Sequence, residues 1–455
     1  MPAAPIILIN AVGLTPRLLP LAPRLAKLAA NGWMRPLKEV VPAVTSTAQA
    51  SILTGKIPSE HGVVANGWLF RETMEVRYWQ QSNRLLQAEP IYAAARTKRP
   101  DFKCAKLFWW FNQGADVALS VTPKPWYGAD GNKVFGVTGS PLELPERLER
   151  ELGRFPFQTF WGPMAGLPCT QWIAKAAANV VETERPDLTL VYLPHLDYNP
   201  QRFGPNGCDM AKEVGELDAA AEPLVDAARK VGARVWVVSE YGHCDVSRVG
   251  FLNRRLRDAG LLTVRDGPFG ENVDLFASRA VAVCDHQLVH VYVAKKHDQQ
   301  RVLEVLSEEP TIAHTYVGEA RGEVGLDHPR SGEIVALAQR DAWFAYPFWK
   351  DDARAPDFAR TVDIHRKIGF DPAEMFFDPS LSAPKLKAAW RLLQKKLGFR
   401  MLMDVIPLDP SMVRGSHGLP AEDLIDRPLL IGDGAPPGED LSLTDVHDLL
   451  EGALA

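Results

Sequence analysis

The sequence has few cysteines, no long apolar run and no large excess of one charge. Its five cysteines lie far apart along 455 residues, and none belongs to a Cys-x-x-Cys pair, which excludes a thioredoxin-type site and a zinc knuckle. No stretch approaches the roughly 18 uncharged apolar residues that a membrane helix needs, so we expect no membrane span. With 51 basic and 56 acidic residues, the net charge of −5 attracts neither nucleic acid nor an anionic membrane in bulk, although a local basic region is compatible with it.

Glycine-rich nucleotide-binding motifs are also missing. The chain has neither a phosphate loop nor a dinucleotide-binding glycine pattern, which disfavours a kinase, an ATPase or a Rossmann-type oxidoreductase. The first residues lead directly into the apolar run 6–9 without a basic region, so we expect a core strand there rather than a signal peptide. Together with the scattered cysteines, this predicts a cytoplasmic protein with reduced thiols.

The apolar segments predict an α/β protein with a mainly parallel sheet sandwiched by helices. Short runs rich in β-branched residues alternate with amphipathic segments, as in such sheets. The clearest predicted strands and helices are 5–9, 188–193 and 234–239, and 17–31, 170–184 and 210–231, respectively. Because strand–helix–strand crossovers are right-handed, the three strands should end at one edge of one sheet, where ligands of open α/β sheets bind.

The remaining segments are predicted to be additions to this core. Residues 68–166, rich in aromatic residues, proline and glycine, are predicted as one insertion, and residues 278–318 as a small α+β insertion. A basic helix is expected at 390–398, and the tail 435–455 is acidic. The predicted core is therefore discontinuous in sequence and consists of 1–67, 167–277 and 319–434.

Several hydroxyl side chains gather in the segment 41–55, where a helix is expected to begin. The unpaired amides and the positive dipole end of a helix start suit an anionic phosphoryl group. Threonine is also a common helix cap, because its hydroxyl oxygen accepts a hydrogen bond from a first-turn amide. Taken alone, Thr45 and Thr47 leave phosphate binding and helix capping both open.

Four segments contain recognisable motifs. The first contains Pro-x-x-Thr45, then Ser-Ile-Leu-Thr-Gly and Pro-Ser-Glu-His-Gly before Asn66, and the other three are 192–205, 239–243 and 415–418. Together they resemble the alkaline phosphatase superfamily, and most closely its type I phosphodiesterase/nucleotide pyrophosphatase and phosphonoacetate hydrolase branch. The first segment resembles the nucleophile region of this branch, and the other three resemble its metal-binding segments and follow in the same order.

The resemblance implies an alkaline-phosphatase-like fold and a metal-dependent phosphoric ester hydrolase, such as a phosphodiesterase or nucleotide pyrophosphatase. It implies Thr45 as the nucleophile, a covalent phosphoryl-threonine, and a second step in which water releases the phosphoryl group. Two divalent metals would make the threonine alkoxide accessible and clamp the phosphoryl oxygens. The expected partner is a small phosphorylated substrate rather than a nucleic acid.

The sequence departs from the family pattern at several metal-ligand positions. Val12 aligns with an acidic ligand of the family, and Asn10 is the nearest polar side chain. Gln201 stands in place of a histidine, while Glu240 and Tyr241 replace an Asp-His pair. These replacements make the following polar residues candidates for substrate contact: Asn66, Asn10, Gln201 and Tyr241.

Only Asp197 and His417 match the family's metal ligands outright, with Glu240 as a conservative replacement. Because few anionic ligands remain, one divalent ion is easier to hold than two. Zinc is the expected metal, and manganese or iron also suits imidazole and carboxylate ligands. Nearby residues that could supply further ligands, or could equally be structural, are His195, His243, Asp363 and His365.

The altered ligand set leaves other functions open. A family member with an incomplete metal site could bind a phosphorylated ligand or a protein partner without hydrolysing anything. Hydrolysis of a phosphonate, or transfer of a phosphoryl group to an acceptor other than water, would use the same residues.

Overall fold

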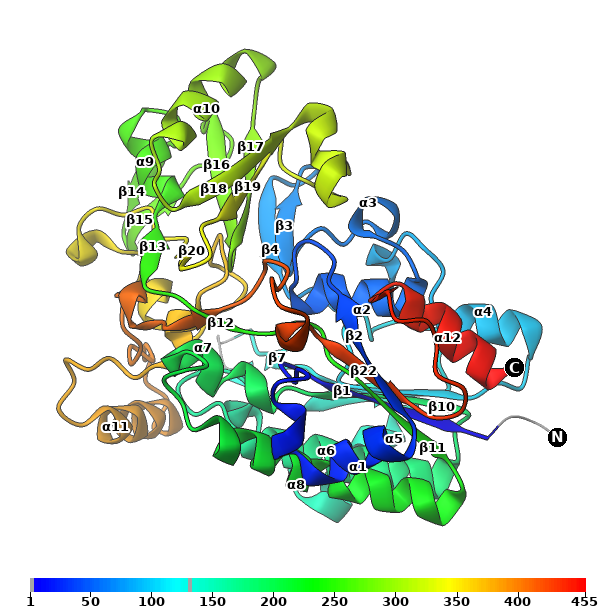
Figure 1. Cartoon of the computed structure of the whole chain (residues 1–455). Coiled ribbons are helices and arrows are strands. Elements are labelled where there is room, and N and C mark those ends of the chain that lie inside the picture. The colour runs from blue at the N-terminus through cyan, green and yellow to red at the C-terminus, as the bar shows by residue number, and fades with distance from the viewer. Residues whose placement is uncertain (1–3, 130–132) are drawn as a thin grey trace.

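A nine-stranded sheet forms the centre of the protein in the computed structural model, which describes residues 4–129 and 133–455 (Figure 1). From one edge to the other, the strands are β23 (Leu441–Ser442), β2 (Trp33–Lys38), β22 (Leu429–Gly432), β11 (Arg234–Val238), β1 (Ile6–Ala11), β10 (Leu188–Leu193), β5 (Cys104–Leu107), β6 (Leu119–Pro123) and β9 (Val137–Ser140). The run from β11 to β6 is parallel, and β22 and β9 pair antiparallel with its two ends. This confirms the predicted fold class.

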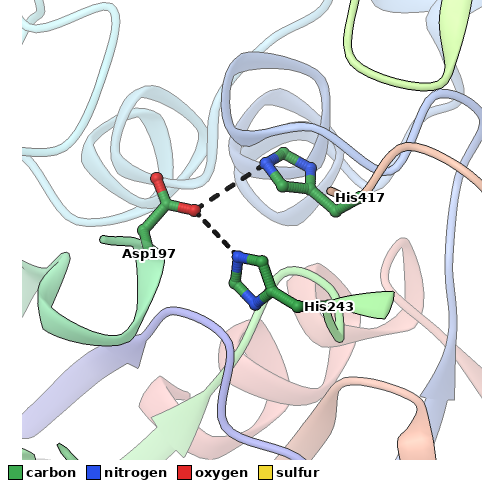
Figure 2. Close-up of side chains that lie close together, drawn as sticks. All are labelled: Asp197, His243 and His417. Atoms are coloured by element: carbon green, nitrogen blue, oxygen red, sulfur yellow. Dashed lines mark hydrogen bonds and ion pairs between the residues drawn. The ribbon is translucent and has the colours of Figure 1, made fainter. Parts of the chain in front are cut away.

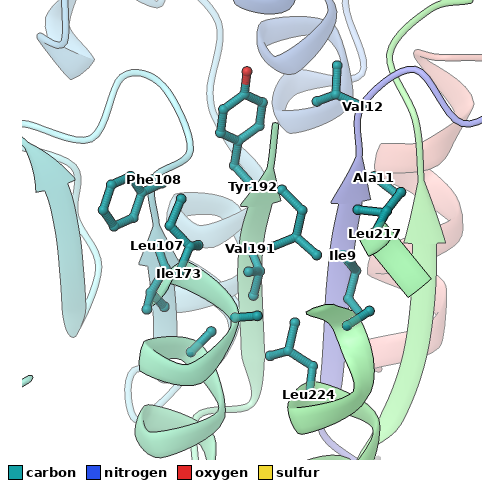
Figure 3. Packing of buried hydrophobic residues seen from close by; sticks show 14 of the residues in the cluster. Ile9, Ala11, Val12, Leu107, Phe108, Ile173, Val191, Tyr192, Leu217 and Leu224 are labelled. Atoms are coloured by element: carbon teal, nitrogen blue, oxygen red, sulfur yellow. The ribbon is translucent and has the colours of Figure 1, made fainter. Parts of the chain in front are cut away.

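The central strands have apolar side chains on both faces because helices cover both sides of the sheet. All six residues of β1 are buried, as are all six of β10. One face carries Ile7 and Ile9 and packs on α1 (Pro23–Asn31), α5 (Glu143–Leu152), α6 (Leu167–Glu184) and α8 (Met210–Val231). Figure 3 shows this layer, with α6 and α8 against the strands. The other face carries Ile6 and Leu8 and packs on α2 (Thr45–Thr54), α4 (Ile91–Lys98) and α12 (Asp445–Leu454).

A smaller antiparallel sheet stands beside the central one and has its own apolar core (Figure 1). Its strands, in spatial order, are β16 (Ala280–Asp285), β17 (Leu288–Val293), β19 (Ile334–Ala338) and β18 (Ile312–Val317). Helices α9 (Leu252–Asp258) and α10 (Gln299–Ser307) contribute to this core. The unit is therefore larger than the predicted insertion 278–318, because β19 and α9 lie outside that range.

Two other predicted boundaries also differ from the structure. The segment 68–166 is not a separate insertion, because β5, β6 and β9 extend the central sheet. The sequence pattern of these strands is weak because they are short and because the buried Lys106 interrupts the apolar pattern of β5. The segment 435–455 is likewise not a loose tail, since it forms β23 at the sheet edge and α12, which contacts α2.

Short elements connect these layers. The small strand pairs are β3 (Gly67–Phe70) with β4 (Glu75–Tyr78), β7 (Trp126–Tyr127) with β8 (Lys133–Val134), β12 (Cys244–Asp245) with β21 (Gly415–Ser416), β13 (Arg248–Gly250) with β20 (Ala342–Phe344), and β14 (Val264–Gly267) with β15 (Gly270–Val273). The remaining α-helices are α3 (Pro58–His61), α7 (Asn199–Phe203) and α11 (Pro384–Lys396). Among the helices in residues 4–129 and 133–455, none is long and apolar enough to cross a membrane.

Candidate active site

Polar residues from distant parts of the chain meet beyond the carboxyl ends of β10 and β11. Asp197 lies in a 3-10 turn after β10, and Glu240, Tyr241 and His243 follow β11. The start of α2 brings Thr45 to the same place, where its hydroxyl contacts Tyr241. The site thus lies at the sheet edge where parallel α/β sheets bind ligands.

Asp197, His243 and His417 form a compact group of potential metal ligands (Figure 2). The Oδ1 atom of Asp197 lies 3.2 Å from Nε2 of His243 and 3.7 Å from Nε2 of His417. One ligand atom from each residue falls within 4.8 Å of the others. A carboxylate and two imidazoles leave a fourth position of a tetrahedral ion open, the arrangement found in catalytic rather than structural zinc sites.

The ring of His417 is oriented for metal binding. Its Nδ1 lies 2.8 Å from the carbonyl oxygen of Ala43, so Nδ1 carries the proton and Nε2 presents its lone pair. Within the described residues, this buried Nε2 has no hydrogen-bond partner. Burial, with a smaller effect of His286, lowers the pKa of His417 well below its ordinary value, which keeps the ring neutral. The donor set therefore fits one divalent ion.

Gln201 contacts the same aspartate from α7. Its Nε2 donates to Asp197 Oδ1 at 2.8 Å. The amide thus occupies the position of the family histidine but acts as a hydrogen-bond donor to the carboxylate. It orients Asp197 and adds no imidazole to the ligand group.

Thr45 is the first residue of α2, and its side chain does not cap the helix. The cap position is Val44, which has no side-chain cap, and the amide of Ser46 donates to Asn66 Oδ1 at 2.9 Å. The Thr45 hydroxyl instead lies 2.9 Å from the hydroxyl of Tyr241. The capping alternative therefore does not account for Thr45, which is free to face a ligand at a positive helix end.

Asn66 is held in place by a buried carboxyl group from the smaller sheet. Asp285 accepts hydrogen bonds from the backbone amide and the side-chain amide of Asn66, at 2.7 and 3.1 Å. Burial raises the pKa of Asp285 to about 7, although both hydrogen bonds oppose this shift. The smaller sheet thereby contributes to the start of α2 through Asn66.

Tyr241 occupies the space between the nucleophile candidate and the ligand group. Its hydroxyl donates to Asp197 Oδ1 at 3.2 Å, and its ring stacks on His417 with centroids 3.7 Å apart. Burial raises the pKa of Tyr241 well above its ordinary value, so the phenol is neutral. A neutral phenol here replaces the family histidine with a hydrogen-bonding group.

Glu240 lies in a different environment from Asp197. Its Oε1 accepts hydrogen bonds from Asn10 at 2.5 Å and from Gln49 at 2.7 Å, while Gln49 Oε1 accepts from the amide of Trp110 at 2.7 Å. Burial raises the pKa of Glu240 to about 8, so this carboxyl is mostly protonated at pH 7. Val12, at the position of the family's acidic ligand, is fully buried in the core. Glu240 is thus surrounded by side-chain amides, whereas Asp197 has two imidazoles beside it.

Three of the predicted ligand candidates lie outside the ligand group of Asp197, His243 and His417. His195 lies 3.2 Å from Glu213 and 3.3 Å from Glu216 on α8, because the strand ends at Leu193 and the following turn separates His195 from Asp197. Asp363 pairs with Arg366 at 2.7 Å and with Lys133 at 3.6 Å. His365 is exposed, with the ring of Tyr127 6.5 Å away.

Three residues near the site were not assigned to it from the sequence. They are Gln49, Asp285 and His286, whose ring lies 3.7 Å from that of His417. Asp285 is the last residue of β16 and His286 begins the turn to β17, and both are buried. A polar pair within an otherwise apolar hairpin was the available signal for these two, whereas nothing marked Gln49 among the other polar residues of its helix.

Comparison with known proteins assigns the chain to a family. The sequence pattern of the type I phosphodiesterase/nucleotide pyrophosphatase family matches residues 6–371, which is most of the chain. The chain therefore belongs to this family. The predicted family is thereby confirmed.

Individual relatives are distant. Human ectonucleotide pyrophosphatase/phosphodiesterase family member 1 is 23% identical over 260 residues, which cover 54% of this chain and 24% of that protein. An uncharacterised pyrophosphatase/phosphodiesterase of Schizosaccharomyces pombe is 24% identical over 224 residues, which cover 48% and 38%. The matches thus span well under half the length of these curated relatives.

Solved structures show the same fold over the whole chain. Phosphonoacetate hydrolase from Sinorhizobium meliloti 1021, in complex with phosphonoformate, aligns with a TM-score of 0.60 and 15% identity, covering 100% of this chain and 96% of that one. Murine ectonucleotide pyrophosphatase/phosphodiesterase 5, in an inactive form with AMP, aligns with a TM-score of 0.59 and 14% identity, covering 99% and 95%.

Proposed function

We propose that the protein hydrolyses a small phosphoric ester, with Thr45 as the nucleophile and one divalent ion held by Asp197, His243 and His417. The observation that carries this proposal is the continuous contact from Thr45 through Tyr241 to Asp197, with distances of 2.9 and 3.2 Å. This contact joins the hydroxyl of Thr45, at the start of α2, to the group of residues that would hold the cation. This is the minimum that phosphoryl transfer to a threonine requires.

The position of Thr45 supports its role as the nucleophile. The side chain is buried, faces Tyr241 and lies at the positive end of the ten-residue helix α2. An incoming phosphoryl group would gain from the helix dipole there. The threonine-to-alanine form of the murine relative is described as inactive, which agrees with a threonine nucleophile in this fold.

The proposed cation has three ligands from this chain. Zinc fits the carboxylate and two imidazoles best, and manganese or iron would use the same atoms. When bound, the ion supplies Lewis-acid stabilisation of the charge on the phosphoryl oxygens. Because Glu240 is mostly neutral and Asp197 supplies one negative charge, a single divalent ion leaves the site positive towards a phosphate.

The residues around Thr45 also provide a path for its proton. Tyr241 donates its own proton to Asp197, so its oxygen is available to accept the hydroxyl proton of Thr45. In the first step a bond forms between Thr45 Oγ1 and phosphorus, the ester P–O bond breaks, and the leaving oxygen takes a proton from solvent, which balances the proton lost by Thr45. In the second step water attacks phosphorus, the bond between Thr45 Oγ1 and phosphorus breaks, and Oγ1 regains a proton from that water. The product is phosphate, or a phosphate monoester when the substrate is a diester.

The proposal is tested by assaying purified protein with p-nitrophenyl phosphodiesters after chelation and after adding back Zn²⁺, Mn²⁺ or Fe²⁺. We expect activity only with metal, at least a 1000-fold loss for Thr45→Ala, and partial activity for Thr45→Ser, because serine retains the hydroxyl. Activity of Thr45→Ala equal to that of the wild type would exclude this nucleophile. A parallel panel of phosphonates and acceptor alcohols separates ester hydrolysis from phosphonate hydrolysis and phosphoryl transfer.

A second candidate function is binding of a phosphorylated ligand without hydrolysis. The observation that favours it is the placement of Tyr241, whose neutral phenol replaces the family histidine and lies between Thr45 and Asp197, at 2.9 and 3.2 Å. A protein that binds AMP or pyrophosphate in calorimetry, yet cleaves no ester or phosphonate with any added metal, would support this alternative.

A further inference from the structure

Helix α11 carries an apolar stripe that the described part of the chain leaves uncovered. Leu386, Trp390, Leu393 and Leu397 recur every three or four positions and therefore share one face. Their exposed fractions are 74%, 57%, 44% and 63%, and α11 contains no buried residue. Its exposure distinguishes this stripe from the apolar faces of α6 and α8, which are packed against the sheet.

The opposite edge of α11 fastens the helix to the protein. Lys387 and Arg391 form ion pairs with Asp404, at 2.9 and 3.0 Å. One turn further on, Lys395 donates to the carbonyl oxygen of Lys133 at 3.3 Å. These three residues lie four positions apart, so the apolar stripe faces away from the body of the protein. Figure 1 shows α11 at the lower left, at the periphery of the structure.

The charge of this segment is opposite to that of the rest of the chain. Residues 384–400 contain six of the 51 basic residues and no acidic residue, which leaves 45 basic against 56 acidic residues elsewhere. The segment is thus +6 and the remainder is −11. Lys385 and Lys396 are exposed and flank the stripe on one side. A basic border around an apolar stripe is typical of helices that lie in a membrane interface.

We infer that α11 docks the protein onto an anionic lipid surface. The stripe residues would enter the boundary between headgroups and acyl chains, with Trp390 at the interface, while the lysines contact lipid phosphates. The β7–β8 pair adjoins α11 through Lys133 and has further exposed apolar side chains on Trp126, Tyr127 and Val134. Pairing of two copies through this face is disfavoured, because it would bring two +6 segments together.

Vesicle flotation tests this inference with the full-length protein. We expect wild-type protein to float with vesicles of phosphatidylcholine mixed with phosphatidylglycerol and not with pure phosphatidylcholine. Trp390→Glu/Leu397→Glu, which removes stripe contacts, and Lys385→Glu/Lys396→Glu, which reverses border charges, should each lower the vesicle partition coefficient by roughly tenfold or more. Raising the salt concentration should weaken binding of the wild type.

Matched controls change exposed residues elsewhere on the surface. Phe276→Glu/Leu424→Glu replaces equally exposed apolar residues, and Lys230→Glu/Arg301→Glu reverses two other surface charges, so neither pair should affect flotation. Circular dichroism checks that every variant is folded. The inference is overturned if the wild type fails to bind anionic vesicles, or if the controls lose binding as strongly as the α11 variants. It is also overturned if light scattering shows a dimer that only the stripe variant dissociates.

Discussion

Asp197 and Glu240 each bring a carboxyl group to the site, but the side chains around the two carboxyl groups differ. Asp197 faces two imidazoles, and His417 turns towards it an Nε2 atom that has no hydrogen-bond partner among the residues the structure describes. Glu240 faces two side-chain amides and has a pKa raised to about 8. One carboxyl is therefore arranged to bind a cation, whereas the other is stabilised in its neutral form. The identity of a residue at a ligand position is thus less informative than the donors around it.

Replacing the aspartate should have the largest effect. Asp197→Asn removes the only carboxylate of the ligand group, so we expect loss of stoichiometric metal and at least a 1000-fold loss of phosphodiesterase activity. Glu240→Gln keeps an acceptor for Asn10 and Gln49, and should retain the metal and most of the activity. Metal content by mass spectrometry, measured beside the activity, checks both variants. Equal loss of metal in Asp197→Asn and Glu240→Gln would contradict the proposed difference between Asp197 and Glu240.

Removing the tyrosine hydroxyl should have the next largest effect. Tyr241→Phe keeps the ring stacked on His417 but deletes the contacts to Thr45 and Asp197, so we expect kcat to fall about 100-fold. The metal stoichiometry should stay the same, because the phenol is not one of the proposed ligands. A rise in activity would instead show that the tyrosine hydroxyl obstructs the reaction, as the binding-only function requires.

Restoring the family histidine at position 201 should strengthen metal binding at Asp197. Gln201→His replaces a hydrogen-bond donor to Asp197 with an imidazole, and we expect the metal affinity to rise about tenfold. Competition with a chelator measures the change. Gln201→Ala is the control, because it removes the amide without adding a ligand and should weaken metal binding.

The smallest expected effect is on stability, and it arises from Glu240. The pKa of Glu240 is higher in the folded protein than in the unfolded chain, so the folded state binds more protons between about pH 5 and 8. Its contribution to stability is therefore full below about pH 4.5 and decreases as pH rises towards 8, by at most about 1.4 kcal/mol per pH unit. Urea unfolding of metal-free wild type and Glu240→Gln should show a difference that varies with pH in this direction. If the free energies of unfolding of the two proteins change with pH in parallel, Glu240 is not protonated in the folded state in the way proposed.

The fold was predictable because its central strands and helices have strong, simple patterns. The predicted strand 188–193 is β10 itself, and the predicted helix 210–231 is α8. Strands β5 and β6 could not be recognised, since Lys106 and the surrounding aromatic segments hide a short apolar run. Burial of a lysine depends on a tertiary contact, here with the carbonyl of Phe111, that sequence periodicity does not record.

The site was predictable only in part, for a related reason. Thr45, Asp197 and His417 occupy positions fixed by recognisable segments, and the structure brings them together around Tyr241. Gln49 is 191 positions from Glu240, and only the folded chain places its amide on that carboxyl. His195 was expected beside Asp197, but a 3-10 turn after β10 directs the two side chains apart.

The hydrogen bonds between Ala43 and the segment 415–418 have a consequence for the chain during its synthesis. Ala43 accepts from His417 and its amide donates to the carbonyl of Gly418, while Ser416 pairs with Cys244. Two residues before the proposed nucleophile Thr45, the backbone is therefore anchored by residues that leave the ribosome some 370 positions later. A nascent chain that has not yet reached residue 417 would carry Thr45 without His417, so the proposed reaction at Thr45 should require that the segment 415–418 has been synthesised.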